Sequence, residues 1–501
     1  MAKARAGLAS AALLIICIAP GSTQIASRDR ILRPVDVADV AGVKGTAHPM
    51  ARAQYDQGRT APTRQLNGSL TFRLSPAQQA DLNRLLREQQ DPSSANYHKW
   101  LRPDQYAARF GMSSHDLAKV TSWLTSQGLT VDGISRNRNE ISFSGSVGQV
   151  EYALKTEIHN YSIRGEQHFA NATDFGLPVA FASEVLGVRG LNDFRPKPRL
   201  RRASPRFTSN ISGNHFLIPG DFATIYDLPS AYDGTGQTIA VVGQTDISNT
   251  DIDAFRSAAG LAKKDPVVVL VPGSGSLAHF SGDETEADLD LEWSGAVASN
   301  ATIKYVTVGN NTNFSVFDSL SYAIQNNVAP VISISYGNCE ANLGKSFVLT
   351  MQQSAQQANS QGQTISGPSG DDGAADCDFK ATSATHGLAV DVPASIPEVT
   401  GVGGTEFTGD ASQCPIDPTT GKHLCPGSVA PADPPYWNGS SSPTSGASAL
   451  IYIPEKTWND TVSGQTFSSG GGGASIFFGK PSWQAGTGVP MMANVTCRIS
   501  P

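Results

Sequence analysis

The segments "TIAVVGQTD" (238–246), "ATIKYVTVG" (301–309), "VAPVISISYG" (328–337) and "GQTISGPSGDDG" (362–373) decide the fold of the second half of this chain. Each is an apolar run that ends in glycine or a polar turn, which is typical of a strand buried on both faces. Segments with helical spacing lie between them. Buried strands that alternate with helices predict an α/β domain built on a parallel sheet.

Helical spacing predicts three helices between these strands, over residues 284–299, 315–326 and 342–360. In a parallel α/β sheet, sites form in loops at the carboxyl ends of the strands. "SYG" and "SGDDG" (369–373) occupy such ends. We expect the strand edge at Ser335, Tyr336 and Gly337 to bind peptides by strand addition.

Residues 66–194 show a different, α+β pattern. Alternation predicts strands at 70–74, 140–146 and 157–163, and helical spacing predicts helices at 75–90, 113–128 and 147–156. The first helix has Ser75 as a candidate N-cap and Pro76 at its first helical position. These residues therefore form a compact unit separate from the parallel sheet.

The N-terminus has the pattern of a secretory signal. Lys3 and Arg5 precede an apolar stretch at 7–19 that is too short to span a membrane comfortably. We expect residues 1–26 to be removed, with no stable membrane association afterwards, and the mature protein to be extracellular. The alternative is an uncleaved anchor. Residues 27–65 are polar and predict a flexible lead-in.

The stretch "RPKPRLRRASPR" (195–206) predicts an exposed linker. Half of its residues are basic and three are proline, so regular pairing is blocked and like charges repel. Such a linker is a good maturation cleavage site. A linker that remains uncut is the alternative.

Charge and cysteine content limit the partners and the compartment. The formal net charge is −7, and no basic face dominates, which argues against a nucleic-acid partner. Export favours disulfides, and we expect the pairs Cys339–Cys377 and Cys414–Cys425. Cys497 is then left without a partner.

The stretch "GDETEADLDLE" (282–292) places six acidic residues at the start of a predicted helix. Glu286 and Asp290 are four residues apart, so they project from one face, where like charges destabilise a helix. The apolar residues that follow predict that the helix is mostly buried: Leu289, Leu291, Trp293, Ala296 and Val297.

Two carboxyl groups at the mouth of a buried helix share protons, so one has a raised pKa and can act as a general base at mildly acid pH. The alternative is a solvated acidic first turn stabilised by the helix dipole. A third carboxylate, Asp371, follows a buried strand. Its alternative reading is an ordinary Asp-Gly turn.

Several long motifs together resemble the sedolisin family, the secreted serine-carboxyl peptidases, in the form of a kumamolisin-like precursor. The resemblance covers residues 66 to 490, and its motifs follow in family order: "YHKWLRPDQYAARFG", "IPGDFATIYDLPSAYDGTGQTIAVVGQTDI", "VISISYGNCE", "HGLAVDVPAS", "VTGVGGTEF" and "GGGGAS…KPSWQ".

The resemblance implies a ferredoxin-like α+β activation prodomain at 66–194 and a subtilisin-like catalytic domain at 207–490. It implies a serine nucleophile with Glu286 as general base, Asp290 orienting that glutamate, and Asp371 stabilising the oxyanion. Substrates would be proteins or peptides at acid pH, and the prodomain would be an intramolecular inhibitor. A C-terminal calcium site is also a family property.

A conventional subtilisin is disfavoured. No D-[ST]-G follows the first strand, where this chain has Gly243, Gln244 and Thr245. His386 lacks the helix pattern that would make it a catalytic base, so it is interpreted as structural.

The nucleophile and the calcium site have no counterparts in this sequence. The family serine lies in a G-T-S-A motif, and the sequence contains no G-T-S. Ser475 belongs to another family motif and is not assigned as nucleophile. We therefore expect a peptidase domain that lacks its C-terminal part, with no activity of its own.

The last residues, 491–501, form an aberrant tail. Read one base earlier, codons for "MMANVTC" permit the family's N-D-G-x-R-D-V, which predicts a frameshift near codon 490. A genuine shortened homologue is the alternative. The competing function is that of a non-catalytic protein that binds peptides along the "SISYG" strand edge.

Overall fold

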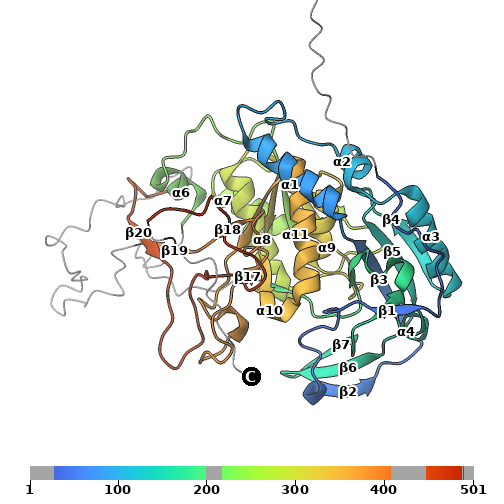
Figure 1. The fold of residues 1–501 in the computed structure, drawn as a ribbon. Helices are drawn as coiled ribbons and strands as arrows, with labels where there is room; N and C mark the ends of the chain where they lie inside the picture. Colours follow the sequence, from blue (N-terminus) through green and yellow to red (C-terminus); the bar gives the residue numbers. More distant parts are fainter. Residues whose placement is uncertain (1–26, 199–216, 408–446, 488, 490–501) are drawn as a thin grey trace, which may run out of the picture.

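The computed structural model describes residues 27–198, 217–407, 447–487 and 489 (Figure 1). The expected signal peptide, most of the basic linker, Cys414, Cys425 and the tail at 491–501 lie outside the described residues. Within the described residues, no helix is both long and apolar enough to cross a membrane.

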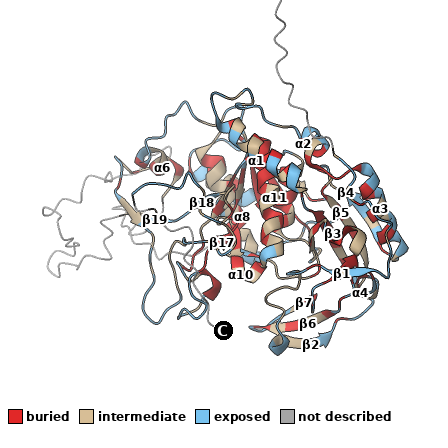
Figure 2. Ribbon diagram, in the orientation of Figure 1, coloured by how far each residue is buried: buried red, intermediate tan, exposed pale blue. Residues whose placement is uncertain are grey.

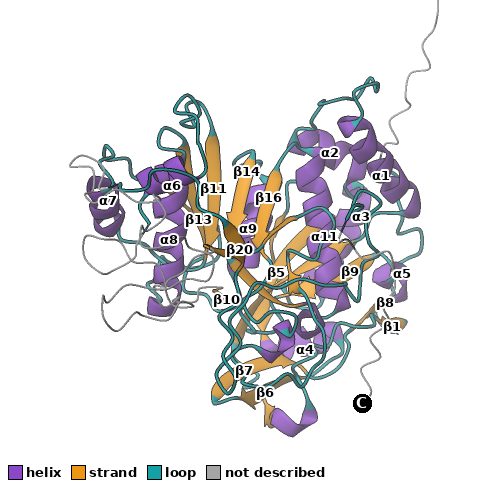
Figure 3. Cartoon of the chain, turned by 90° about the vertical axis from the view of Figure 1, so that its left-hand side faces the viewer, coloured by secondary structure: helices purple, strands orange, loops and turns teal. Residues whose placement is uncertain are grey.

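A six-stranded sheet forms the centre of the second half of the chain (Figure 3). Its order is β12-β13-β11-β14-β16-β18, and each pairing is parallel. The strands are β11 (Thr238–Gly243), β12 (Val267–Leu270), β13 (Thr302–Thr307), β14 (Val331–Ile334), β16 (Thr364–Pro368) and β18 (Thr400–Val402). The α/β class with a parallel sheet of the subtilisin-like kind is thus confirmed.

Helices cover both faces of this sheet. They are α7 (Asn249–Ala258) and α8 (Ser281–Val297) on one face, and α9 (Val316–Gln325) and α11 (Lys345–Ser360) on the other. In β11, Ala240 and Val242 pack with the α9 and α11 side, whereas Val241 packs with α7 and α8. Successive strand residues therefore enter two different cores, which explains why the strand is apolar throughout.

Two expectations for the helices need correction. The helix predicted at 342–360 is divided into α10 (Glu340–Leu343) and α11, because Gly344 between them has φ +80°, a left-handed value that favours glycine. The apolar face predicted for α8 is also wrong in part. Leu289 is 37% exposed, and the buried side of the helix carries Glu286, Ala287, Leu291, Gly295 and Ala296.

The first half of the chain contains a four-stranded antiparallel sheet with the order β4-β5-β3-β9. Its strands are β3 (Gln65–Phe72), β4 (Thr130–Ile134), β5 (Glu140–Ser146) and β9 (Val185–Arg189). Helices α1 (Pro76–Gln90), α2 (Pro103–Phe110) and α3 (Ser114–Ser126) follow β3, and α4 (Val147–Leu154) follows β5. This β-α-β-β-α-β arrangement is ferredoxin-like, as the sequence predicts.

Smaller elements complete the fold. They are β1 (Val40–Gly42), β2 (Asp56–Arg59), β6 (Ile158–Ile163), β7 (Glu166–Asn171), β8 (Gly176–Pro178), α5 (Val179–Ala182), β10 (Lys197–Pro198), α6 (Pro219–Ile225), β15 (Tyr336–Cys339), β17 (Asp391–Val392), β19 (Thr405–Phe407), β20 (Glu455–Thr457) and two 3-10 turns, Ala53–Tyr55 and Asp376–Asp378. Strand β10 pairs with β15 and joins the two halves.

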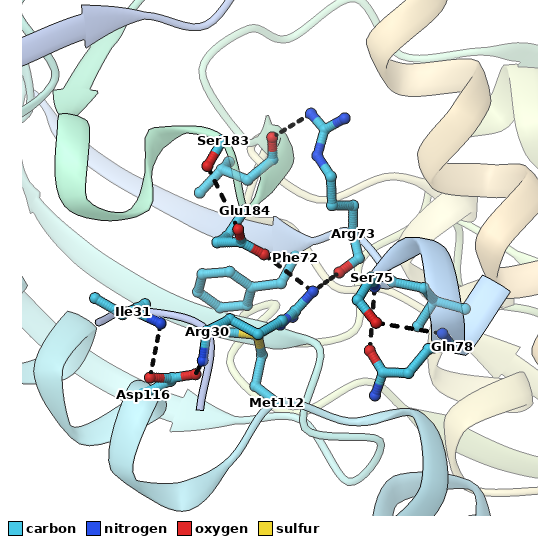
Figure 4. Close-up of polar contacts among 12 residues, drawn as sticks. Arg30, Ile31, Phe72, Arg73, Ser75, Gln78, Met112, Asp116, Ser183 and Glu184 are labelled. Carbon is cyan, nitrogen blue, oxygen red and sulfur yellow. Dashed lines mark hydrogen bonds and ion pairs between the residues drawn. The ribbon is translucent and has the colours of Figure 1, made fainter. Parts of the chain in front are cut away.

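Residues 27–65 differ from the flexible lead-in that their composition suggested. The backbone N–H groups of Arg30 and Ile31 donate to the Asp116 carboxylate at 2.6 and 3.1 Å, and the Arg30 side chain pairs with Glu184 at 3.1 Å (Figure 4). Ile31 is fully buried in the core of the α+β unit. A polar segment is ordered here because its backbone and its arginine find partners far along the chain.

The start of α1 is capped as the sequence predicts. The Gln78 backbone N–H donates to Ser75 Oγ at 3.2 Å, and the Gln78 side chain accepts from the Ser75 N–H at 3.1 Å (Figure 4). This reciprocal pair is a capping box, and Pro76 occupies the first helical position. Short-range chemistry therefore fixes where α1 begins.

Neutral amides dominate the contact between the α+β unit and the parallel-sheet unit, where the buried helix α11 lies (Figure 2). Gln353 on α11 bonds both Phe72 O (2.9 Å) and Leu74 N (3.2 Å). Other such bonds are Asn137 to Gln357 (2.7 Å), Gln89 to Ser360 O (3.0 Å), Asn67 to Asn311 (2.9 Å) and Asn313 to Gly190 O (2.9 Å). The ion pair Arg189–Asp318, at 3.2 Å, joins the same two units.

A disulfide joins Cys339 at the end of β15 to Cys377, which confirms that predicted pair. It closes a loop with a sequence separation of 38 residues.

Peptide mapping under non-reducing conditions should recover the Cys339–Cys377 pair and the Cys414–Cys425 pair. Recovery of Cys497 linked to any of these four residues would contradict the pair to which that residue is assigned.

Replacing Ser75 with alanine should destabilise the chain by about 1 kcal/mol, because the Gln78 N–H loses its acceptor. The free energy of unfolding can be measured in urea for both proteins. Ser126→Ala is a matched control, since the Ser126 hydroxyl donates to Trp123 O and caps no helix start. Equal losses in the two variants would contradict the capping assignment.

Candidate active site

The start of α8 is attached to the carboxyl edge of the parallel sheet. The Phe280 N–H, directly before the helix, donates to Thr245 Oγ1 at 2.9 Å. Thr245 follows β11, and its carbonyl accepts from the Tyr305 and Thr307 hydroxyls at 3.0 Å each. These bonds fix the acidic turn of α8 beside the strand ends, where sites form in parallel sheets.

Three carboxylates predicted from the sequence meet at this edge. Glu286 lies on the buried side of α8, 2% exposed. Ser335, between β14 and β15, donates its hydroxyl to Asp290 Oδ1 at 2.7 Å. Asp371, which follows β16 and is 8% exposed, is close enough to act electrostatically on Glu286.

The pKa values of the first two carboxyls are raised. Burial raises the pKa of Glu286, and the negative charges of Asp290 and Asp371 raise it further. Burial also raises the pKa of Asp290, while the hydrogen bond from Ser335 works in the opposite direction. Glu286 and Asp290 therefore retain protons at pH values where exposed carboxyls have lost them, and because their charges interact, their titrations are coupled.

The three residues predicted to bind substrate have different positions. The Ser335 side chain is used by Asp290, and Tyr336 is 1% exposed, so neither side chain lines an open groove. Gly337 lies against Asp391, where an added Cβ would come within 1.8 Å of Asp391 Oδ1. Only the backbone edge of β15 therefore faces a peptide.

That backbone edge is already paired with the linker. Lys197 and Pro198 form β10, antiparallel to β15, with Lys197 opposite Gly337 and Pro198 opposite Tyr336. The amide of Gln244 donates to the Pro196 carbonyl at 3.1 Å. An extended segment of the chain itself thus occupies the strand edge beside α8.

Sequence reasoning missed two residues of this site, Gln244 and Asp283. The Gln244 amide donates to Asp283 Oδ1 at 3.1 Å as well as to the linker. Burial raises the pKa of Asp283. Both carried a signal: Gln244 follows the first buried strand, and Asp283 lies three residues before Glu286 on the same helical face.

Ser475 and His386 lie in other contacts. The Ser475 hydroxyl donates to Glu340 Oε2 at 2.7 Å, and His386 Nδ1 lies 2.7 Å from Asp378 Oδ1. Both contacts agree with the sequence-based decision to assign neither residue a catalytic role.

No metal is assigned to this chain. Carboxylate oxygens of Asp251, Glu284 and Asp288 come within 4.8 Å of one another, but acidic groups on exposed surfaces often gather without an ion. The calcium site implied by the family resemblance stays a prediction that the described residues do not test. No step below involves a metal ion.

Residues 53–194 match the family model for the pro-kumamolisin activation domain. Sedolisin from Pseudomonas sp. (strain 101) is 27% identical over 452 residues, which cover 86% of this chain and 70% of that protein. Kumamolisin from Bacillus sp. (strain MN-32) is 26% identical over 464 residues, 90% of this chain and 74% of the relative. Over most of its length, the chain is therefore similar to the sedolisin and kumamolisin peptidases.

Other similar proteins cover less of this chain. Human tripeptidyl-peptidase 1 is 28% identical over 364 residues, 70% of this chain and 63% of that protein. Among solved structures, Pseudomonas sedolisin complexed with two molecules of pseudo-iodotyrostatin aligns with a TM-score of 0.39 and 26% identity, over 53% of this chain and 65% of the other.

Glu286→Gln should change how stability depends on pH. Because the folded-state pKa of Glu286 lies above its unfolded value, its favourable contribution is present at acid pH and is lost as pH rises through the folded-state pKa. The variant cannot ionise, so at pH 8 it should be more stable than the wild type by about 1.4 kcal/mol per unit of pKa shift. At pH 4 the two should be similar.

Urea unfolding at several pH values measures this difference. Glu284→Gln is the matched control, because Glu284 lies in the same turn of α8 and is only partly buried. Parallel stability curves for the wild type and Glu286→Gln would contradict a buried, proton-retaining Glu286.

Proposed function

We propose that this chain is the precursor of a secreted serine-carboxyl endopeptidase that acts on proteins or peptides at acid pH. The observation that carries the proposal is the group Glu286, Asp290 and Asp371 at the carboxyl edge of the parallel sheet, in which Glu286 and Asp371 are buried. Burying like charges together is costly, and such arrangements concentrate at functional sites. Similarity to the sedolisin and kumamolisin peptidases supports the reaction class.

The proposed roles follow from proton positions. Glu286 accepts the proton of a serine nucleophile, so it must be ionised when the reaction begins. In the precursor, burial and the neighbouring carboxylates keep Glu286 protonated, which suits an inactive form. Asp290, one helical turn away, orients Glu286, and the Ser335 hydroxyl orients Asp290. Asp371 donates to the developing oxyanion, so it must be protonated. A shared titration that keeps one proton while another is lost confines activity to a limited pH range.

The activation domain acts as an intramolecular inhibitor in this proposal. Its C-terminal continuation forms β10 on the strand edge of β15, where strand addition would hold a substrate. A peptide substrate cannot pair with β15 until Lys197 and Pro198 leave. Cleavage in the basic linker would then separate the two units.

Export is the third part of the proposal. The N-terminal signal pattern and the Cys339–Cys377 disulfide both suit an oxidising, extracytoplasmic compartment.

The nucleophile is the part that rests on the family resemblance alone, since the sequence contains no G-T-S. A second candidate function is therefore a pseudo-peptidase that binds peptides without cleaving them. The pairing of β10 with β15 favours this second function, because it shows that the edge of β15 can hold an extended peptide segment.

The 501-residue chain should hydrolyse no protein substrate between pH 2 and pH 7. Re-sequencing of the gene past codon 490 then tests for a G-T-S-A segment in another frame. A protein that includes this segment should be active at acid pH and inactive as Glu286→Gln, with Glu284→Gln as the matched control. Activity of the 501-residue chain that disappears in Glu286→Gln would contradict the missing nucleophile.

In the active protein, Asp371→Ala should lower kcat by roughly two to three orders of magnitude while changing KM less, since an oxyanion donor acts in the transition state. Asp371→Asn should keep more activity at higher pH, because an amide donates at any pH. A wild-type optimum near pH 8 would refute these roles. Peptide binding without hydrolysis, in a gene with no such segment, would favour the pseudo-peptidase.

A further inference from the structure

Phe194, at the point where the activation domain becomes the linker, lies between two histidine rings. Its ring centroid is 4.3 Å from that of His48 and 4.5 Å from that of His168, with interplanar angles of 16° and 29°. The three residues come from the N-terminal segment, β7 and the linker, so distant parts of the chain meet on one aromatic ring.

The histidines hold the linker at its entrance to the candidate active site. Only one residue separates Phe194 from Pro196, whose carbonyl binds Gln244. The next residues form β10 on β15. A displacement of Phe194 would therefore pull directly on the segment that covers the strand edge.

We propose that His48 and His168 form a proton-operated clamp on Phe194. Protonation of the His48 ring opens the clamp and frees the linker from β15 as the pH falls.

The bonding of His48 in the closed clamp requires its neutral form. The Met50 backbone N–H donates to His48 Nδ1 at 3.2 Å, so this nitrogen must carry a lone pair. A proton on Nδ1 would place two N–H groups against each other. A cation on the aromatic face of Phe194 offsets part of this cost, but two cationic rings on opposite faces would repel one another.

Protons can reach the clamp through a cavity of about 70 Å³. Its walls include His48, Phe194, Arg189, Arg195 and Asp318. The cavity is polar and exceeds the volume that one water molecule needs, so water can carry a proton to the His48 ring.

The direction of the effect follows from the closed-state pKa of His48. Burial, together with a smaller effect of His168, lowers this pKa to about 3. A group whose closed-state pKa lies below its open-state value favours opening as pH falls, here between about 6.5 and about 3.

Other charged groups face the clamp, and not all act in the same direction. They are Glu166 (3.4 Å from His168 Nε2), Asp193 (3.3 Å from His168 Nδ1), Lys197, Arg189, Arg195, Asp283 and Asp318. Burial raises the pKa values of Asp283 and Asp318, so their protonation favours the closed state. Below the ordinary carboxyl pKa of 3.8 both groups are neutral in either state, and His48 continues to favour opening. Glu166 acts in the same direction, because Lys197 of the linker and His168 lower its pKa in the closed state.

Arg195 makes the closed state easy to leave. Its Nε and Nη2 atoms are buried without a hydrogen-bond partner, and its guanidinium lies 5.2 Å from the centre of the Phe280 ring. A buried cation with incomplete hydrogen bonding is costly, and the linker regains its solvation when it leaves.

Hydrogen exchange of the full chain from pH 7 to pH 3 tests the clamp, with exposure times scaled for the intrinsic exchange rate. Protection of residues 190–198 in the wild type should fall with pH, by up to about tenfold per pH unit for one titrating group. Protection of α1 in the same samples reports that the domain stays folded. The measurement needs no peptidase activity, so it stands apart from the proposed function.

His48→Phe should keep the stack but not the His48 titration, so the protection of residues 190–198 should fall less steeply with pH than in the wild type. His48→Gln also cannot take up the proton. If the phenylalanine ring of the first variant does not fit, His48→Gln should show the same shallow dependence of protection on pH. His115→Phe is the matched control, because His115 is exposed and pairs with Asp29. Wild-type protection that stays constant or rises on acidification, or the wild-type slope in both His48 variants, would overturn the proposal.

Discussion

Parallel pairing of β11, β14 and β16 is the constraint on which the rest of the site depends. Parallel strands end at the same edge, so the residues just after each strand become neighbours although they are far apart in sequence. Gln244, Ser335 and Asp371 all reach the site in this way. The contact from Phe280 to Thr245 then brings α8 to the same edge. Without this register, Glu286 would be an ordinary acidic residue on a helix surface.

Strand β15, which follows β14 in the chain but belongs to a separate three-stranded sheet, accepts the linker beside the carboxylates. Backbone groups of β15 that would otherwise be unpaired are satisfied by β10. The linker therefore lowers the cost of an exposed strand edge while it covers the site. Closure of the site is therefore a consequence of one strand with a free side, and the contacts around Phe194 decide how long that side stays covered.

Local patterns predicted what local chemistry determines. Ser75 and Pro76 located the start of α1, the apolar runs located the buried strands, and the spacing of Glu286 and Asp290 identified the acidic face. The expected burial of Leu289 was wrong, because helical periodicity shows that one side of a helix is buried but not which side. In α8 the buried side carries the Glu286 carboxylate.

The remaining features depend on partners distant in sequence. Arg30 is ordered by Asp116 and Glu184, and no pattern near residue 30 reveals this. The hydrogen bond from Gln244 to the linker likewise becomes visible only when strand ends and linker are placed together. The break at Gly344 could have been foreseen, since glycine at a helix start permits the left-handed backbone found there.

The amide contacts on α11 affect how the association of the two units responds to the salt concentration of the medium. Dissolved ions screen charges on exposed surfaces, but they have little effect on neutral groups that bond to each other in a buried contact. Gln353, Gln357 and Asn137 carry no charge, and the Arg189–Asp318 ion pair between the units is largely shielded from solvent. The association of the two units should therefore depend only weakly on salinity, whereas acidity acts on the carboxyl and histidine groups beside the linker.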